Sequence, residues 1–219
     1  MVEAVPDWNT LYEHDEFAPD EPEPFLLSAV SRPTMTSDGA SCVLDIGCGA
    51  GRHLVWLAEQ GFEVFGVDDA SRALERSRAR LHAAGAVARL VRGDFVSLPF
   101  TGDSFDMVVA IHALYHGDQA ALRRALSEVA RVLRDGGLLV ATFLSTLTWK
   151  YGLGVQVEPF TYVQPEGPER GIPHHYVTAE MLVDYLAAFN VETMRLDELT
   201  DQQGRRHCHW QVACVRTGR

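Results

Sequence analysis

The segment VLDIGCGAGR, residues 43–52, carries the clearest chemical pattern in this sequence: an apolar run that ends in closely spaced glycines. Glycine has no Cβ, so a ligand can lie against the bare backbone of such a turn where a helix begins. The spacing is GxGxG with Asp45 two residues ahead of it, which suits a nucleoside ligand without a pyrophosphate. The dinucleotide fingerprint requires a further glycine where this chain has Arg52, so NAD is disfavoured.

Acidic residues follow the next two strand-like runs. Asp68 ends EVFGVD, where a carboxylate can accept hydrogen bonds from both hydroxyls of a ribose. Asp94 ends the third run, where it can accept from the exocyclic amine of adenine while Phe95 flanks the ring. Asp69 is kept as a further cofactor contact, although a solvated turn or helix cap suits it as well. A single acid at the end of a strand often only shapes a turn. The three acids Asp45, Asp68 and Asp94 belong to successive strands, and together they indicate a nucleoside site.

Histidines are candidates for removing a proton from an acceptor, because the imidazole pKa lies near neutrality. The segment IHALYH places His112, Tyr115 and His116 just after the fourth strand-like run, and GIPHHYVT places His175 before a late helix. His116 is our first choice for a general base and His175 the second. For each of these histidines, a hydrogen-bonded structural role is the alternative.

The same segments raise the question of a metal ion, and the sequence disfavours one. Magnesium sites are rich in carboxylates, whereas these segments offer histidine. Zinc would suit imidazole ligands, but the adjacent His174 and His175 cannot easily both point at one ion in an extended chain. We therefore expect no metal.

These residues lie where strand patterns and helix patterns meet. Short apolar runs predict strands at 42–47, 63–68, 87–94, 104–111 and 138–144. Apolar residues at helical spacing predict helices at 52–61, 71–85 and 119–137. Strands that alternate with helices indicate crossover connections, and hence an α/β fold with a parallel, doubly wound sheet.

Residues 145–177 break this alternation with eight Gly or Pro residues and no sustained period, which predicts a structureless lid over a substrate. Beyond it we expect a helix at 178–189 and an antiparallel hairpin of 191–199 and 209–216 at one edge of the sheet. The aromatic residues of the lid favour a planar or apolar acceptor, with a small satellite core as the alternative. They are Trp149, Tyr151, Phe160, Tyr162 and Tyr176.

Composition restricts the partners and the compartment. A chain of 219 residues with 47% hydrophobic and 22% charged residues is typical of one soluble globular domain, as a monomer or homodimer. The net charge of -11 disfavours nucleic acid as a partner. No apolar run approaches the roughly 20 residues of a membrane helix, and the first residues do not resemble a signal peptide. With four cysteines that lack CxxC spacing, we expect reduced thiols and a cytoplasmic location.

Five motifs together resemble the class I S-adenosylmethionine-dependent methyltransferases of the small stand-alone, small-molecule type. They are VLDIGCGAGR, the acid in GVDDAS, GDFVSLPF, SFDMVVAIHALYH and RVLRDGGLLVATF, and they cover about residues 40–144 in the family's order. The resemblance implies a Rossmann-like, seven-stranded sheet, mostly parallel with an antiparallel last strand, and helices on both faces. Its expected parts are a helical cap (1–40), a cofactor-binding core (41–144), a substrate lid (145–177) and a C-terminal helix and hairpin (178–219).

The resemblance also implies roles for single residues. Asp45 would order the glycine turn, Asp68 would hold the ribose, and Asp94 with Phe95 would hold the adenine. The backbone of Ala110 and Ile111 would lie beside the sulfonium. The amino-acid half of the cofactor would lie against the turn residues Gly47, Cys48, Gly49 and Gly51.

We therefore predict methyl transfer from S-adenosylmethionine (SAM) to an O, N or S atom of a small molecule, with S-adenosylhomocysteine (SAH) as product. After its fourth strand, the chain lacks the Asn/Asp-Pro-Pro-Tyr/Phe motif of the DNA amino-methylating members, which argues against a nucleic acid acceptor. Two alternatives remain open. One is a SAM-binding sensor or assembly module without catalysis, and the other is an NAD-dependent oxidoreductase.

Overall fold

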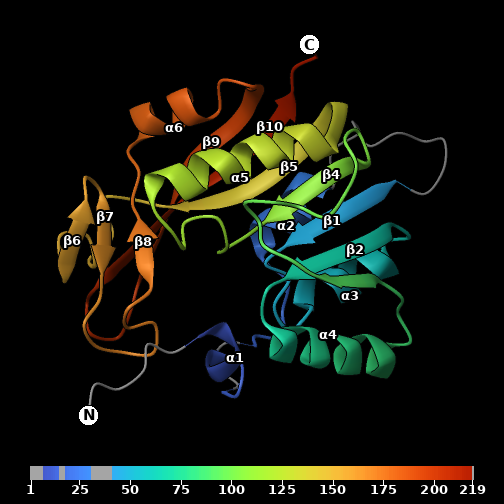
Figure 1. Cartoon of the computed structure of the whole chain (residues 1–219), viewed down its shortest axis with the longest axis horizontal. Coiled ribbons are helices and arrows are strands. Elements are labelled where there is room, and N and C mark those ends of the chain that lie inside the picture. The colour runs from blue at the N-terminus through green and yellow to red at the C-terminus, as the bar shows by residue number, and fades with distance from the viewer. Residues whose placement is uncertain (1–6, 15–17, 31–40, 219) are drawn as a thin grey trace.

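The computed structural model describes residues 7–14, 18–30 and 41–218, and a seven-stranded sheet forms its centre (Figure 1). The strands are β1 (Cys42–Ile46), β2 (Glu63–Asp68), β3 (Arg89–Arg92), β4 (Phe105–Ala110), β5 (Leu133–Leu144), β9 (Phe189–Thr200) and β10 (Arg206–Arg216). They lie in the order β3-β2-β1-β4-β5-β10-β9. The last strand, β10, pairs antiparallel with both β5 and β9, whereas the other pairs are parallel. The predicted doubly wound sheet with an antiparallel last strand is confirmed.

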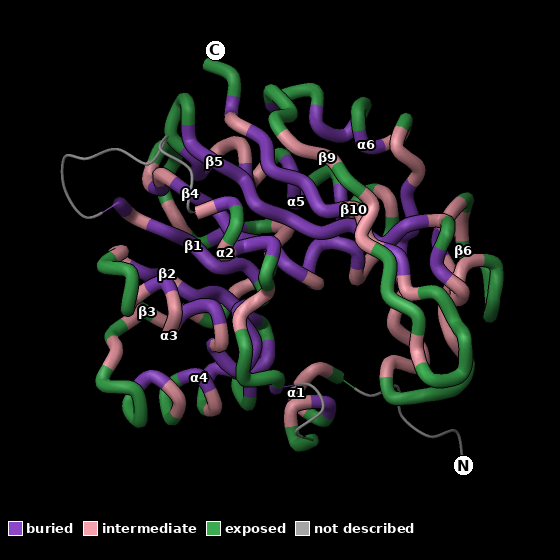
Figure 2. Tube along the Cα trace, turned by 180° about the vertical axis from the view of Figure 1, so that it is seen from behind, coloured by how far each residue is buried: buried purple, intermediate pink, exposed green. Residues whose placement is uncertain are grey.

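Helices cover both faces of this sheet (Figure 1). One face carries α2 (Pro24–Val30), α3 (Arg52–Glu59) and α4 (Ser71–Ala84), and the other carries α5 (Gln119–Val132) and α6 (Ala179–Tyr185). Neighbouring strand residues point to opposite faces, so Val43 packs with the first group of helices and Leu44 with the second. Burial of such a side chain stabilises the fold by roughly 1.5–3 kcal/mol. Figure 2 shows the buried strands running through the middle of the molecule.

Local signals account for several element ends. The side chain of Asp118 accepts from the Ala121 amide at 2.6 Å and begins α5, and Thr178 accepts from Met181 in the same way at α6. The predicted extension of the helix to residue 137 is wrong. Leu133 instead pairs with Phe105 of β4 and is fully buried, so tertiary pairing outweighs the helical propensity of the segment.

Residues 145–177 contain a second, three-stranded antiparallel sheet, so the prediction of a structureless segment is wrong. Its strands are β6 (Val155–Glu158), β7 (Thr161–Val163) and β8 (Pro173–His175). Each strand has only three or four residues, which is too short to show an alternating pattern in the sequence. The glycines lie beside these short strands, and in the sequence they indicate an irregular loop.

Two short helices, α1 (Trp8–Leu11) and α2, lie within the expected helical cap (1–40), of which residues 1–6, 15–17 and 31–40 lie outside the described residues. Arg76 of α4 donates to the carbonyl of Tyr12, which holds α1 beside the carboxyl ends of the strands. The four cysteines are free, as expected. No helix among the described residues has the length and apolar character needed to cross a membrane.

Candidate active site

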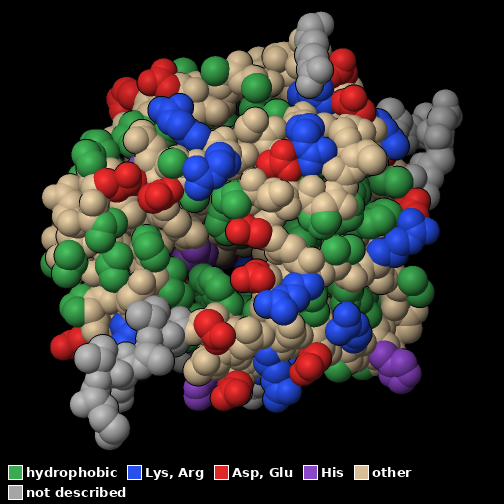
Figure 3. All heavy atoms as spheres, viewed as in Figure 1, with side chains coloured by type: hydrophobic (Ala, Val, Ile, Leu, Met, Phe, Trp, Pro, Cys, Tyr) green, Lys and Arg blue, Asp and Glu red, His purple; other side chains and the backbone are tan. Residues whose placement is uncertain are grey.

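Two adjoining cavities lie at the carboxyl ends of the parallel strands. The first, of about 230 Å³, and the second, of about 190 Å³, share five wall residues. The face drawn in Figure 3 is hollowed near its centre, with a histidine side chain in the hollow and carboxylates near its rim. This is the edge at which doubly wound sheets bind their ligands. The shared wall residues are Trp8, Tyr12, Gly47, His112 and His116.

The glycine turn forms one wall of both cavities. Gly47 has a φ of +65°, and a Cβ there would lie 2.7 Å from the Cβ of Ala113. Gly49 has a φ of +54°, and its Cβ would lie 2.4 Å from the hydroxyl of Tyr12. Side chains at these two positions would both strain the backbone and fill the turn. Cys48 lines the second cavity, whereas Gly51 lies behind the turn against Ser77 of α4.

Asp68 ties this turn to the end of β2. Its two carboxylate oxygens accept from the amides of Gly49 and Ala70, each at 2.9 Å, and the residue lines the first cavity. Burial raises the pKa of Asp68, while these two hydrogen bonds act in the opposite direction. Each carboxylate oxygen keeps a second lone pair, so Asp68 can still accept from the hydroxyls of a ribose.

The remaining acids divide between the cavity and the core. Asp69, Asp94 and Phe95 line the first cavity, and both acids are exposed. Asp45 lines neither cavity, because it is 1% exposed and its Oδ2 lies 3.7 Å from Nδ1 of His53. The structure therefore places Asp45 behind the turn, where an ordering role fits better than ligand contact.

The end of β4 leads directly into the histidine segment. Ala110 is fully buried and lines neither cavity, whereas Ile111 and Tyr115 line the second. His112 has a φ of +56°, a strained conformation for histidine, and its amide donates to Oγ1 of Thr142 at 2.8 Å. Burial, with lesser contributions from His209 and other cationic groups, holds the pKa of His112 well below its usual value. His112 is therefore a neutral imidazole near pH 7.

Both nitrogens of His116 face acceptors. Nδ1 lies 3.1 Å from the carbonyl of Ala113, and Nε2 lies 3.8 Å from Oε1 of Glu169. Burial lowers the pKa of His116 despite the nearby carboxylate. The sequence pattern did not single out Glu169, which lies between β7 and β8 and lines the second cavity. No signal in the sequence separates Glu169 from Glu166 of the same Pro/Gly-rich loop.

His175 lies away from both cavities. It is 1% exposed, and its two ring nitrogens bond to the hydroxyls of Thr161 at 2.7 Å and Tyr185 at 3.0 Å. These contacts match the structural alternative for His175 and do not support its choice as a base. Tyr115 bonds through its hydroxyl to Nδ1 of His112 at 3.1 Å, and burial raises the pKa of this phenol.

Comparisons with known proteins agree with this geometry. The family model described as "Methyltransferase domain" matches residues 43–137. An uncharacterized methyltransferase from Mycobacterium bovis is 32% identical over 187 residues, which cover 78% of this chain and 69% of that protein. This chain belongs to the class I SAM-dependent methyltransferase superfamily.

Other relatives of this methyltransferase differ in length and in the activity that their names state. The ribosomal RNA small subunit methyltransferase C of Alcanivorax borkumensis is 36% identical over 123 residues, which cover 55% of this chain and 37% of that protein. A solved SAM-dependent methyltransferase from Methanosarcina mazei has the same fold, with a TM-score of 0.75 at 23% identity over 91% of this chain and 100% of that one. The aligned regions span only 35% to 43% of the length of three of the curated relatives.

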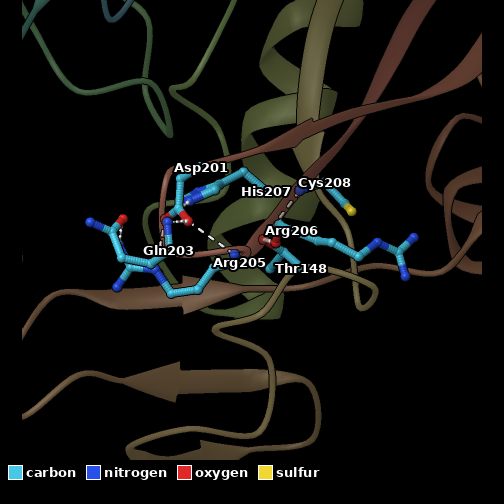
Figure 4. A network of polar contacts seen from close by, with 7 residues as sticks. All are labelled: Thr148, Asp201, Gln203, Arg205, Arg206, His207 and Cys208. Carbon is cyan, nitrogen blue, oxygen red and sulfur yellow. Dashed lines mark hydrogen bonds and ion pairs between the residues drawn. The ribbon is translucent and has the colours of Figure 1, made fainter.

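A third cavity of this methyltransferase, of about 530 Å³, adjoins the first two at His112. Its walls come mainly from the β9–β10 hairpin, together with Glu23 and Thr142. Figure 4 shows how the end of this hairpin is held. Asp201 accepts from the amides of Gln203 and Arg205 at 2.9 Å each, and its other oxygen lies 3.1 Å from Nε2 of His207. Asp201 and His207, which line the third cavity, are thus held by hydrogen bonds at the end of the hairpin.

The aromatic residues of 145–177 do not line any of these three cavities. Tyr176 is fully buried, and its ring centroid lies 5.4 Å from that of Tyr151 and 5.9 Å from that of Tyr162. Trp149 packs at the hairpin, with the guanidinium of Arg205 4.4 Å from its ring. The satellite-core alternative therefore describes Tyr151, Tyr162 and Tyr176, and Trp149 packs on the hairpin instead.

Proposed function

We propose that this chain transfers a methyl group from SAM to an O, N or S atom of a small-molecule acceptor. The observation that carries the proposal is the position of His112, which lines the two cavities at the glycine turn and also the third cavity. A cofactor at the turn and an acceptor in the third cavity would then both contact one half-buried imidazole, that of His112.

The residues of the first two cavities fit SAM. Bare backbone at Gly47 and Gly49 leaves room for the amino-acid half of the cofactor, and the oriented carboxylate of Asp68 suits the ribose. Asp94 and Phe95 stand farther along the first cavity, where the adenine would lie. When bound, SAM supplies an electrophilic methyl carbon on its sulfonium sulfur.

The chain contributes positioning and exclusion of water. Trp8 and Tyr12 from the first helical segment cover the turn, and the hydrogen bond from the His112 amide to Thr142 fixes the backbone at the residue that lines all three cavities. Holding two reactants in one orientation can supply about 7–11 kcal/mol of the barrier reduction. Most of the rate enhancement is assigned to this effect.

His112 is the proposed base for an acceptor that must lose a proton. It is neutral because of burial, and it lines all three cavities. His116, the first choice from the sequence, has one nitrogen on a backbone carbonyl and the other toward Glu169. This arrangement favours His112 over His116.

A small acceptor is supported by the charge of the chain and by the bounded third cavity. The net charge of -11 and the exposed acids at the first cavity would repel a polyanion. One relative is named as a ribosomal RNA methyltransferase, so the experiment has to distinguish an RNA acceptor from a small-molecule acceptor. The free cysteines support a cytoplasmic location for the reaction.

The test is incubation with SAM and either a metabolite extract or total RNA, followed by mass spectrometry for a one-methyl gain and for SAH. We expect methylated small molecules and unmodified RNA. The His112→Asn variant, which still offers the cofactor cavity, is the control for background methylation. SAH binding without any methylated product would support the non-catalytic sensor instead, and methylated RNA would contradict the small-molecule assignment.

A further inference from the structure

We propose that His116, His174 and Glu169 form a binding site for a divalent transition-metal ion of the zinc type in the wall of the second cavity. Their ligand atoms all lie within 4.8 Å of one another. This assignment concerns metal binding itself and does not depend on the methyl acceptor. It replaces the expectation of no metal that the sequence alone supported.

The donor set and spacing suit such an ion. Nε2 of His174 lies 3.2 Å from Oε2 of Glu169, and Nε2 of His116 lies 3.8 Å from Oε1. Ligands at about 2.1 Å from a tetrahedral zinc ion are about 3.4 Å apart, so small side-chain movements would complete the site. Imidazole nitrogens favour zinc and similar ions over magnesium.

The orientation of both imidazoles suits a cation bound between them and Glu169. Nδ1 of His116 lies 3.1 Å from the carbonyl of Ala113, and Nδ1 of His174 lies 3.0 Å from the carbonyl of Ile172. A carbonyl can only accept, so each Nδ1 carries the proton, and a neutral ring then turns the lone pair of Nε2 toward Glu169. Metal-binding histidines are commonly held by this same contact of the other nitrogen.

The nitrogen of this cluster that lacks a hydrogen-bond partner among the described residues is Nε2 of His116. The His116 side chain is 8% exposed, and this nitrogen is buried. Two imidazole lone pairs and a carboxylate directed at one another repel unless a cation lies between them. A bound divalent ion would satisfy all three groups.

The backbone brings the two histidines together before any ion binds. His116 and His174 form an antiparallel bridge, and the amide of His175 donates to the carbonyl of Tyr115 at 2.9 Å. The sequence argument against zinc was that the adjacent His174 and His175 cannot easily share an ion. In the structure their side chains do point to different partners. His175 turns away to Thr161 and Tyr185, and Glu169 takes its place as the third ligand.

Three protein ligands leave a fourth position for another donor. His116 and Glu169 line the second cavity, and His174 does not, so the open position faces that cavity. Two histidines and a glutamate with one open position match the pattern of zinc sites that bind an exogenous ligand. A ligand with a thiolate, amine or hydroxyl donor is the class that this position would take.

Lys150 is the competing cation, since its Nζ lies 3.8 Å from Oε2 of Glu169 and its side chain is 37% exposed. If Lys150 together with protonated histidines balances Glu169, the cluster is an ion-pair network and needs no metal. The two explanations differ in what a Lys150→Met substitution does to metal binding.

The experiment uses the full chain without a histidine tag, treated with a chelator and then titrated with Zn²⁺ and with Co²⁺. We expect one ion per chain and visible ligand-field bands of four-coordinate Co²⁺. Glu169→Gln and His174→Ala should each weaken binding at least about tenfold. His207→Ala, which removes a histidine from another carboxylate pair, should bind as the wild type does.

The outcomes separate the explanations. No stoichiometric binding by the folded wild type, checked by circular dichroism, would overturn the proposal. Binding that appears only in Lys150→Met would identify Lys150 as the native cation and would also overturn it. Unchanged binding in Glu169→Gln and in His174→Ala would place the ion elsewhere. Glu169→Gln preserves the shape of the side chain, so it tests the site even if His174→Ala fails to fold.

Discussion

The amide of Gly49 donates to Oδ2 of Asp68 at 2.9 Å, which joins the turn after β1 to the end of β2. The two residues are 19 positions apart in the chain, and the parallel pairing of β1 with β2 brings them together. One carboxylate therefore has two tasks: it holds the shape of the glycine turn and faces the first cavity. Substitutions of Asp68 and Gly49 should separate these tasks.

Asp68→Ala should weaken the binding of SAH by roughly 2–3 kcal/mol, or about 30- to 150-fold, because it removes a charged acceptor and leaves two amides unpaired. Isothermal titration calorimetry measures the change. Asp184→Ala, an exposed acid on α6, is the control and should leave the affinity unchanged. Equal SAH affinity of Asp68→Ala and wild type would remove Asp68 from the site, and a preference for NAD would contradict the cofactor assignment.

Gly49→Ala should lower stability and also abolish cofactor binding. A left-handed φ costs an alanine about 1–2 kcal/mol, and the new methyl group would in addition meet Tyr12. Gly85→Ala is a matched control, since Gly85 has a φ of +64° at the end of α4 but open space around its Cβ position. Urea unfolding should show a loss in both variants, whereas SAH titration should show a loss in Gly49→Ala alone. Retained SAH binding in Gly49→Ala would mean that the turn tolerates a side chain.

The glycine turn and the core strands could be predicted because their signals are local. The apolar run of β1, the glycines that follow and the acid at the end of β2 are each visible within a few residues of sequence. The start of the helix predicted at 178–189 is equally local, because Thr178 caps it by accepting from the Met181 amide. Such features are determined by neighbours in the chain and need no knowledge of tertiary contacts.

The grouping of His116, Glu169 and His174 could not be predicted in this way. His116 and His174 meet through a bridge between segments 58 positions apart, and Glu169 reaches them from a loop without a regular pattern. The third cavity likewise depends on how the β9–β10 hairpin lies against β5. These sites arise from tertiary packing, which the local pattern of residue types does not encode.

Stability should fall as the pH drops below about 6.5, in part because of His209. Burial lowers the pKa of His209 to about 4, so between pH 4 and 6.5 the unfolded chain binds more protons than the folded one. This residue alone can account for up to about 3 kcal/mol of lost stability across that window. His209→Phe keeps a ring against His112 and should make the loss shallower in urea unfolding at pH 7 and 4.5. His82→Phe, on an exposed part of α4, should leave the pH dependence unchanged.

Filling the third cavity should impair the acceptor and spare the cofactor. Leu199 lies on its wall and is 66% exposed, so Leu199→Trp can add bulk without disturbing the core. We expect reduced methylation of the small-molecule fraction. The affinity for SAH should stay within about twofold of the wild-type value, because the substitution lies outside the cofactor cavities. Val183→Trp adds the same bulk on α6, at a position that lines none of the three cavities. Equal methylation by both variants would place the acceptor outside the third cavity.

The last prediction concerns His112 as the base. His112→Asn is the informative substitution, because asparagine tolerates the left-handed backbone at this position and its amide cannot accept a proton near neutral pH. Where proton removal limits the rate, we expect turnover to fall by about two to four powers of ten while SAH affinity changes little.

The pH profile gives the decisive measurement for His112. A base must be neutral, and burial holds the pKa of His112 well below 6.5, so wild-type turnover should persist below pH 6.5 and decline only at lower pH. Tyr115→Phe removes the hydroxyl that bonds to Nδ1 of His112 and should shift this acidic limb, whereas His112→Asn should abolish it. If His112→Asn keeps both the turnover and the acidic limb of the wild type, His112 is a structural residue. The acceptor would then arrive already deprotonated or lose its proton to another group, and His112 would contribute only by lining the three cavities.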